Sequence, residues 1–492
     1  NRRSTSMGVL AKGSPLDTCL ARLSVLSYNL LAPLYVRPVD ERTGTVQPFA
    51  AFEWAEPAAQ RLEWAVRQPK LAAELTASRA DLICLQEVQY EAAPDGTFAL
   101  PAWLQLDGYE AHVPAQRELS DIAARNFRVL RCGAAIGNAI LVRRERLTVV
   151  DSAKPANTRV QLLVRGREGG ALHALLPTAV ACVHLDAKDE EQRVKAVLRC
   201  LELATAMGTR ELIVCGDMNS ECLPGSCLGA FFDGAPPPTR EELKRECASA
   251  LRLEGVEGAV ATPSEEQLAG WMALHKSVVE SCRAQRIRLA RVPTGGTRAA
   301  YAHGATSGPC VQWQLDHIFY TPRTLELSSH WQTLEADPES SAAGLPSLTC
   351  PSDHLPVAAT FAPHAPAVLP NDKRQELLSR VDELVAQQVR ERADLVALLE
   401  EEGRAVAAAD GETAGDSSKN IDENKAGSTK KKKRGPPSPA MQAFLRSKRE
   451  RERALKAEQR QEREELILSL GDVHLDAVEE HVGSATAWCA SV

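Results

Sequence analysis

Short apolar runs that end in polar side chains recur between residues 23 and 362, and they constrain the fold more than any other feature. The clearest is ELIVCGDMNSE at 211–221, where four apolar residues have the composition of a buried strand. Asp217 and Asn219 follow it one residue apart, so both side chains can point the same way. Helix-like segments lie between such runs, as at 189–208. This alternation predicts an α/β or α+β domain built on sheets.

The same reading places further elements along the domain. Beyond Asp233 a polar insertion, 233–310, interrupts the pattern and contains two helix-like pieces, at about 239–253 and 264–290. The other expected elements are one helix at 58–78 and strands at 22–31, 81–89, 137–150, 179–185, 313–321 and 352–361.

The composition changes after Pro363. A long amphipathic helix is expected at 371–403, ending at Gly403, and a charged helix at 438–471, with Ser438 as its N-cap. We expect these helices to be exposed or to bind protein partners. The remaining parts are an N-terminal extension, 1–22, a disordered linker, 404–437, and a tail, 472–492.

The linker contains the run KKKKR at 430–434. Such a run is typical of a nuclear-import or RNA-contact patch, and a merely solvating tract fits it equally well. The net charge of the whole chain is −7, so any basic surface must be local.

Cysteine placement indicates a reducing compartment. Three of the 13 cysteines, Cys84, Cys182 and Cys215, lie inside strand-like runs, which favours buried thiols over a disulfide scaffold. The sequence contains no run of 18 or more apolar residues, the length that a membrane-spanning helix needs. We therefore expect an intracellular protein, cytoplasmic or nuclear, although the chain starts at Asn1 and organelle targeting stays open.

Polar side chains end six of the strand-like runs, and together they form a candidate site. Strand ends that face one cleft can gather carboxylates, amides and histidines, which suit Mg²⁺ or Mn²⁺ better than zinc. Phosphodiester hydrolysis needs such a cation, a base for water and donors for the phosphate. The set comprises Asn29, Glu87, His184, Asp217 with Asn219, Asp316, and Asp353 with His354.

The motifs that carry these residues resemble the endonuclease/exonuclease/phosphatase superfamily. SYNLLAPLY, LICLQEV, HL, CGDMNS, LDHIFY and PSDHLPV stand in that family's order, and the opening motif, the RLEW helix and LDHIFY look most like its deadenylase branch of carbon-catabolite-repressor-type and nocturnin-like enzymes. The resemblance covers about 23–362. It implies a four-layer sandwich, in which two mixed β-sheets pack face to face with helices outside and the active site lies at one edge.

The resemblance also implies roles for the site residues. Glu87 would be the main Mg²⁺ ligand, with Asn29 and Asp353 close enough to help. Asp217 would orient or deprotonate the attacking water. Asn219 would hold the scissile phosphate.

Two histidines would complete that machinery. His354 would contact the phosphoryl oxygens, kept protonated by Asp316, because an adjacent carboxylate raises the pKa of a histidine. His184 would donate a second hydrogen bond to the phosphate. Trp313, three residues before Asp316, is a candidate for stacking on a nucleobase.

Each residue also has a structural interpretation. Asp217 and Asn219 could form an ordinary Asx turn, His184 could be a core histidine, and Trp313 could belong to the core or its rim. The basic residues Arg117, Arg125 and Arg128 are read as a solvated face, although they could steer a phosphate backbone.

The stretch HLDAKDEEQRVK at 184–195 departs from the deadenylase pattern, which has an aromatic and a proline there. Its acidic residues should repel a polyanionic strand at short range. The leading hypothesis is a Mg²⁺-dependent deadenylase-like 3′-exoribonuclease acting on RNA. The alternatives are a nocturnin-like or other small-substrate phosphatase, which acts on a small nucleotide phosphoester, and a catalytically silent scaffold.

Overall fold

The computed structural model divides the chain into two compact units, Asn1–Ala365 and Pro366–Val492. The residues it describes are 8–12, 16, 21–46, 52, 54–55, 57–222, 226–231, 239–241, 264–301, 310–365, 371–415, 437–469, 478 and 481–482.

The first unit contains an eight-stranded mixed sheet. Its strand order is β1-β15-β16-β2-β3-β6-β5, with β4 paired to β3; β2 and β3 run parallel, and β16 is antiparallel to β2. The strands are β1 (Gly8–Leu10), β2 (Leu23–Asn29), β3 (Leu82–Ala92), β4 (Phe98–Ala99), β5 (Tyr109–His112), β6 (Ala135–Arg143), β15 (Leu325–Trp331) and β16 (Val357–Pro363).

A six-stranded mixed sheet packs against it, in the order β11-β14-β10-β9-β8-β7. Here β9 and β10 are parallel and β14 is antiparallel to β10. The strands are β7 (Leu147–Ser152), β8 (Arg159–Gly166), β9 (Thr178–His184), β10 (Leu212–Asp217), β11 (Ala290–Arg291) and β14 (Asp316–Tyr320); a separate ribbon pairs β12 (Arg298–Ala300) with β13 (Val311–Trp313).

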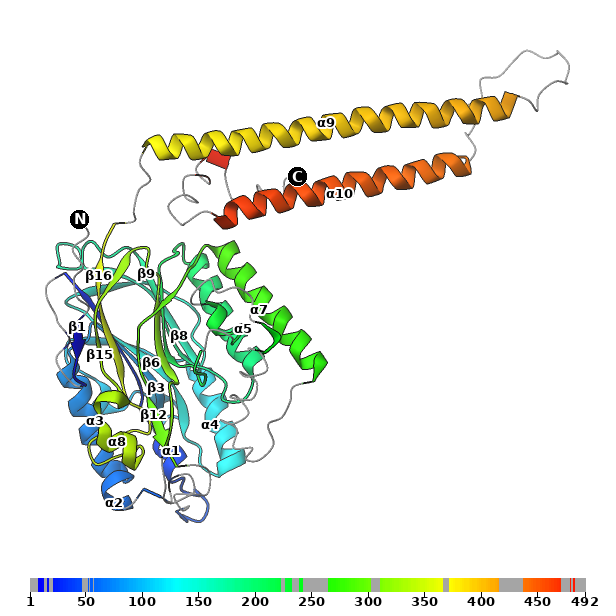
Figure 1. The fold of residues 1–492 in the computed structure, drawn as a ribbon. Helices are drawn as coiled ribbons and strands as arrows, with labels where there is room; N and C mark the ends of the chain where they lie inside the picture. Colours follow the sequence, from blue (N-terminus) through cyan, green and yellow to red (C-terminus); the bar gives the residue numbers. More distant parts are fainter. Residues whose placement is uncertain are drawn as a thin grey trace. The chain divides into compact units, whose positions relative to one another are not determined.

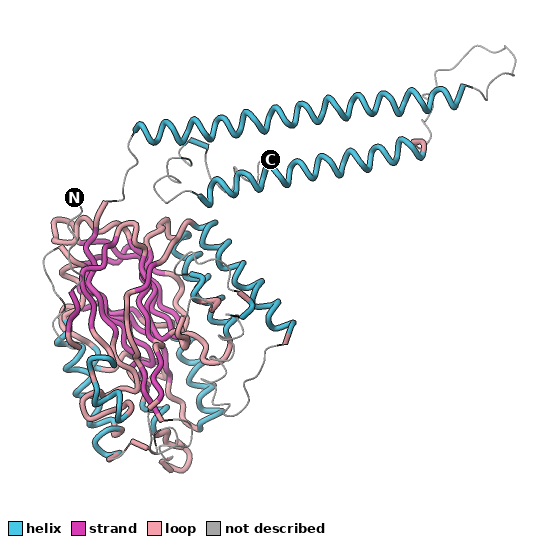
Figure 2. The backbone as a smooth tube through the Cα atoms, in the orientation of Figure 1, coloured by secondary structure: helices cyan, strands magenta, loops and turns pink. Residues whose placement is uncertain are grey.

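Apolar side chains of both sheets meet in one buried layer, which includes Val25, Cys84, Cys182 and Ile318. Helices cover the two outer faces (Figures 1 and 2). The first sheet packs on α3 (Trp64–Ser78) and α4 (Gln116–Leu130), and the second on α5 (Glu190–Ala206) and α7 (Glu265–Gln285). The expected four-layer sandwich is confirmed.

Shorter helices also lie in the described part of the first unit. They are α1 (Pro33–Val36), α2 (Ala58–Arg61), α8 (Pro338–Ala343) and the 3₁₀ turns Ala102–Leu104, Gly229–Phe231 and Leu334–Ala336.

Two expected elements are divided in the structure. The strand expected at 137–150 is the end of β6 and the start of β7, because the charged residues 143–146 turn the chain and the amide of Arg146 bonds the carbonyl of Arg143. The helix expected at 58–78 is α2 and α3, separated where Glu63 is extended. Periodicity alone does not show such breaks.

The insertion also differs from its sequence pattern. Its second helical piece is α7, which ends at Gln285, where Arg286 takes a left-handed φ of 55°. Of the first piece, 239–253, only 239–241 lie within the described residues. The end of the insertion forms β11 and β12, which pair with strands of the expected domain.

The second unit contains two long helices, α9 (Asn371–Gly415) and α10 (Pro439–Ser469). Gly403 does not end the first helix, so residues 404–415 of the expected linker are helical. Ser438 caps α10 by accepting from the amide of Met441. The Lys-rich run at 430–434 lies outside the described residues, as do most of 1–22 and of 472–492.

The helices α9 and α10 are antiparallel. Arg451 bonds Glu402 near one end of the pair, and Gln459 bonds Gln388 further along. Among the described helices none is long and apolar enough to cross a membrane. The core cysteines Cys84, Cys182 and Cys215 are buried and carry no disulfide.

Candidate active site

The ends of four strands place the predicted side chains at one edge of the sandwich. Asn29 ends β2, His184 ends β9 and Asp217 ends β10. Because β9 and β10 are parallel, His184 and Asp217 are register partners. Asp316 begins the antiparallel β14 and lies opposite Asp217 on its other side. Sheet register therefore brings together residues that are distant in sequence.

Asn29 joins the two sheets through its amide nitrogen. Nδ2 donates to Oε1 of Glu87 at 3.1 Å and to Oδ2 of Asp217 at 3.0 Å. Its Oδ1 accepts from the amide of Leu31 at 3.0 Å, and the side chain is fully buried. Asn29 thus holds two carboxylates beside each other and offsets part of their repulsion.

Glu87 lies in a bulge of β3. The pairing with β6 shifts between Leu85 and Val88, and Glu87 has a φ of 56°, a left-handed value that costs energy for a residue with a Cβ. Oε2 accepts from the amide of Ala32 at 3.0 Å. Removal from water raises the pKa of Glu87, and Asp353 raises it further, although His184 and these hydrogen bonds oppose the shift.

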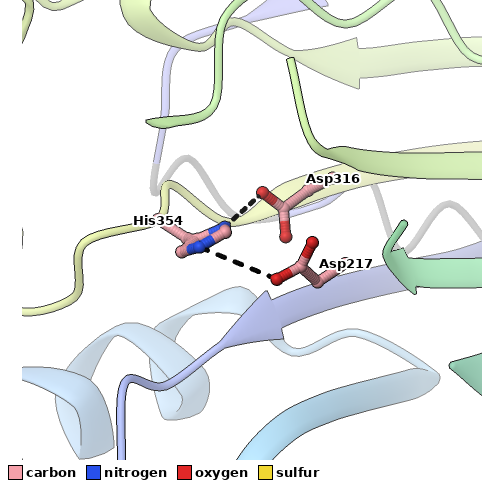
Figure 3. Close-up of side chains that lie close together, drawn as sticks. All are labelled: Asp217, Asp316 and His354. Atoms are coloured by element: carbon pink, nitrogen blue, oxygen red, sulfur yellow. Dashed lines mark hydrogen bonds and ion pairs between the residues drawn. The ribbon is translucent and has the colours of Figure 1, made fainter. Parts of the chain in front are cut away.

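His354 contacts two neighbouring aspartates through its ring nitrogens (Figure 3). Its Nδ1 is 2.7 Å from Oδ2 of Asp316, and its Nε2 is 3.7 Å from Oδ2 of Asp217. Burial lowers the pKa of His354, but Asp316, Asp353 and Asp217 outweigh it and raise the pKa to about 10. The imidazole is therefore protonated at neutral pH and can donate from Nε2.

Several groups around Asp217 stabilise its ionised carboxylate. Burial raises its pKa, but His354 and His184 together lower it below the ordinary value, helped by the amide of Asn219 and by Asn29. His184 Nε2 lies 3.6 Å from Oδ2 of Asp217, and its side chain is 26% exposed. His184 is thus at the site surface and not a core histidine.

Asn219 combines a structural role with its place at the site. Its amide donates to Oδ1 of Asp217 at 2.8 Å, which is an Asx turn, and its φ is 46°. Its Nδ2 donates to the carbonyl of Leu185 at 2.9 Å. The turn fixes Asn219 beside Asp217 and the end of β9.

Asp353 lies between His354 and Arg298, a residue outside the motifs. Its Oδ1 is 4.0 Å from Nε2 of His354 and is buried without a hydrogen-bond partner among the described residues. Its Oδ2 is 3.4 Å from Nη2 of Arg298. Trp313, on the paired strand, lies under that guanidinium, 5.9 Å from the ring centroid.

Two oxygen donors at the site fit a hard divalent cation. Asp217, Asp316 and His354 lie within 4.8 Å of one another, but a protonated His354 has no lone pair to offer a metal. The unpartnered Oδ1 of Asp353 and the carboxylate of Glu87 are anionic oxygens of the kind that Mg²⁺ prefers.

The acidic stretch after His184 has local bonding roles. Asp186 accepts from the amides of Lys188 and Asp189, and Asp189 caps α5. Glu190 pairs with Arg193 at 2.8 Å. Several of these acids are thus part of a helix-capping loop, which lessens but does not remove their repulsion of a polyanion.

Buried groups that the sequence analysis did not single out support the site. Arg67, 1% exposed, donates to the carbonyls of Leu30, Leu31 and Pro351, so it ties the segment after Asn29 to the one before Asp353. Others are Ser352, which donates to the carbonyl of Asn29 at 2.6 Å, and Thr297, whose hydroxyl accepts from the amide of Asp316. No local motif marks them, because their partners are distant in sequence.

Two known proteins are similar to this chain in sequence. It is 24% identical over 406 residues to "Carbon catabolite repressor protein 4 homolog 1" of Arabidopsis thaliana, covering 75% of this chain and 61% of that protein. It is 22% identical over 371 residues to the "CCR4-Not complex 3'-5'-exoribonuclease subunit Ccr4" of Schizosaccharomyces pombe, covering 69% of this chain and 49% of that protein. Both are of the carbon-catabolite-repressor type that the motifs indicated, and the matches span about half to three fifths of their lengths.

Solved structures give weaker likenesses. ANGEL2, described as a 2',3'-cyclic phosphatase, has a TM-score of 0.45 at 18% identity, covering 70% of this chain and 96% of that one. The human Nocturnin catalytic domain has a TM-score of 0.36 at 18% identity, with the same coverage. The sequence profile of the Endonuclease/Exonuclease/phosphatase family matches residues 27–354, which span the whole site from Asn29 to His354. The chain belongs to that family.

Proposed function

We propose that this protein is a Mg²⁺-dependent phosphodiester hydrolase, and specifically a deadenylase-like 3′-exoribonuclease. One observation carries the proposal: the amide of Asn29 bridges the carboxylates of Glu87 and Asp217, while His354 faces the same oxygen of Asp217. A carboxylate for a cation and a carboxylate for water are thus bridged by one amide, and a cationic donor lies beside the second carboxylate.

Glu87 and Asp353 are the residues proposed to hold Mg²⁺, with Mn²⁺ as a substitute. Asn29, expected as a further ligand, donates its Nδ2 to Glu87 and thereby fixes the direction of that carboxylate. When bound, the cation offsets negative charge on the phosphoryl oxygens.

Asp217 is proposed to act on the attacking water. Its pKa lies below the ordinary value, so it is ionised at neutral pH but is a weak base. We therefore assign it mainly to orienting the water and to receiving its proton, as the water oxygen bonds to phosphorus and the bond from phosphorus to the leaving ester oxygen breaks; the leaving oxygen takes a proton from solvent. Asn29 and Asn219 keep its two oxygens in place.

His354 is proposed to donate from Nε2 to a phosphoryl oxygen. Asp316 accepts from Nδ1, which fixes the ring and keeps it protonated. His184 supplies a second donor from the exposed side, and Asn219 holds the phosphate. Donors preorganised in this way stabilise the charge that grows in the transition state.

RNA as substrate is supported by one of the two relatives, which is named a 3'-5'-exoribonuclease subunit. Trp313, partly exposed on β13, is a candidate for contact with a nucleobase. The two C-terminal helices are proposed to bind protein partners.

A small-substrate phosphatase is the second candidate function. The loop after His184 exposes Asp186 and Asp189 to solvent, and their charge tolerates a small nucleotide phosphoester better than a long polyanion. A catalytically silent scaffold is disfavoured, because Glu87, Asp217 and His354 keep the ionisable groups that the chemistry needs and lie at one place.

A substrate panel separates these functions. Labelled oligo(A), a dinucleotide 2′-phosphate and inositol phosphates are incubated with the protein and Mg²⁺, with and without chelator. Stepwise shortening of oligo(A) with release of mononucleotides supports the exoribonuclease. Inert RNA with phosphate release from a small substrate supports the phosphatase, and no turnover of any substrate leaves the scaffold.

A further inference from the structure

We propose that Arg298 is a substrate-binding residue that takes a second, non-scissile phosphate of the substrate. Arg298 belongs to the insertion at 233–310, outside every motif that identified the site. The inference rests on the proposed function and deepens it, because it assigns the substrate to compounds that carry more than one phosphate.

The position of Arg298 beside the site is fixed by its backbone. Residue 298 pairs with Trp313 in the β12–β13 ribbon and forms an isolated bridge with His354. The neighbouring hydroxyl of Thr297 accepts from the amides of Leu315 and Asp316. A strand of the insertion is thereby attached to both segments that carry the Asp316–His354 pair.

The guanidinium of Arg298 is held at the site but retains hydrogen-bonding capacity. One face lies over the ring of Trp313, and Nη2 lies 3.4 Å from Oδ2 of Asp353. Its Nε is buried and has no acceptor among the described residues. The side chain is 36% exposed, so an anion can reach it. Arginine offers a planar set of donors that fits a phosphate group in two-point contact.

The position of Arg298 relative to Asp353 indicates which phosphate Arg298 binds. The donors proposed for the scissile phosphate, His184 and His354, face Oδ2 of Asp217. Arg298 instead lies at Oδ2 of Asp353, whose other oxygen, Oδ1, lies nearer to His354. An anion bound by Arg298 is therefore separated from the scissile phosphate by the Asp353 carboxylate. In a nucleic acid strand, the next phosphate is the group available for that position.

The test compares two substrates, a short oligo(A) and bis(p-nitrophenyl) phosphate, which has a single phosphate. Arg298→Met and the charge-preserving Arg298→Lys are measured in the full chain with Mg²⁺. The matched control is Arg199→Met, which removes an exposed arginine paired with Glu202 on α5. Melting temperatures show that each variant is folded.

We expect Arg298→Met to lower kcat/KM for oligo(A) about tenfold, mainly through KM, because one charged contact is lost. On the single-phosphate diester Arg298→Met should cause a clearly smaller loss, because only the contact of Arg298 with Asp353 is removed there. The slope of log kcat/KM against log salt for oligo(A) should become shallower by about 0.7, the value for one contact to a single strand. The kcat/KM of Arg298→Lys for oligo(A) should lie between those of wild type and Arg298→Met, since lysine keeps the charge but cannot make the planar two-point contact.

Equal losses on both substrates would overturn the inference, because Arg298 would then serve the scissile phosphate or position Asp353. No loss on either substrate would overturn it too, and the proposed function would still stand. Failure of the proposed function shows separately, as wild-type protein that does not cleave oligo(A), and the inference would fall with it.

Discussion

The Nδ1 atom of His354 lies 2.7 Å from Oδ2 of Asp316, and both side chains are buried. This contact, with those to Asp217 and Asp353, raises the pKa of His354 to about 10 despite burial. A histidine with an ordinary pKa would be largely neutral at pH 7.5. We therefore expect the pair to set how the proposed reaction depends on pH.

Asp316→Asn should move the alkaline limb of the pH–rate profile to lower pH. In wild type, His354 keeps its proton until the pH approaches about 10. Loss of the Asp316 charge lowers that pKa, so the protonated fraction falls within the neutral range and kcat/KM at pH 8 drops by about 10²-fold. Rates from pH 6 to 10 check this, with Asp107→Asn, an exposed carboxylate, as control. An unchanged alkaline limb would show that His354 does not act as a cationic donor.

Glu87→Gln should remove turnover and cation binding together while the domain stays folded. The amide keeps the shape of the side chain but loses the anionic oxygens proposed to hold Mg²⁺. We expect a loss of about 10³-fold in kcat, and no heat of Mg²⁺ or Mn²⁺ binding by calorimetry. Glu91→Gln, exposed on the same strand, is the control. Retained cation binding in Glu87→Gln would place the metal on other residues.

Chelation should stop the wild-type reaction, and added Mg²⁺ should restore it. Because burial and Asp353 raise the pKa of Glu87, the carboxylate is lost at a higher pH than an ordinary glutamate as the solution is acidified. We therefore expect Mg²⁺ affinity to weaken as the pH falls, and to begin weakening at a higher pH than for a site built on an ordinary glutamate. Titrations at pH 5, 6 and 7 measure it; affinity that is constant down to pH 5 contradicts the assignment.

Arg67→Met should destabilise the first unit. Burial lowers the pKa of Arg67 to about 10, and its donors serve the carbonyls of Leu30, Leu31 and Pro351. Methionine fills similar volume but leaves three buried carbonyls without a donor, which costs about 3 kcal/mol or more in the free energy of unfolding. Urea denaturation measures the change. Lys70→Met on the same helix removes a half-buried lysine that donates an exposed hydrogen bond to the carbonyl of Leu348, and it should cost far less. Similar losses in both variants would mean that Arg67 does not join the two segments.

A chain that ends at Ala365 should fold and keep its chemistry. The chain divides into its two compact units between Ala365 and Pro366, and the site residues from Asn29 to His354 lie in the first unit. We expect kcat to stay within about twofold of that of the full chain. Melting temperature and kcat of the two chains check this. A shortened protein that aggregates or loses turnover would show that the second unit is needed by the first.

Much of the fold follows from local sequence. Strands such as β10 and β3 appear as short apolar runs, because burial of alternating or continuous apolar residues is encoded within a few positions. Their polar ends, among them Asn29, Glu87 and Asp217, were predicted as a site because side chains at strand ends are costly to bury without a function or a partner.

Other features depend on contacts between distant segments. The bulge that gives Glu87 its φ of 56° arises from pairing with β6, and the helix at 371–415 continues through Gly403, although glycine is a common stop. Local periodicity carries no information about these partners.

The sequence by itself determined which side chains end the strands and which chemistry they suit, because strand composition and ligand type are local properties. The tertiary structure decided how they meet: Asn29 donates to two carboxylates, Arg67 ties two segments together, and Arg298 reaches Asp353 from an insertion. The physical reason is that hydrogen bonds and ion pairs act over a few ångströms in space, whereas their partners here are 36 to 284 residues apart in the chain.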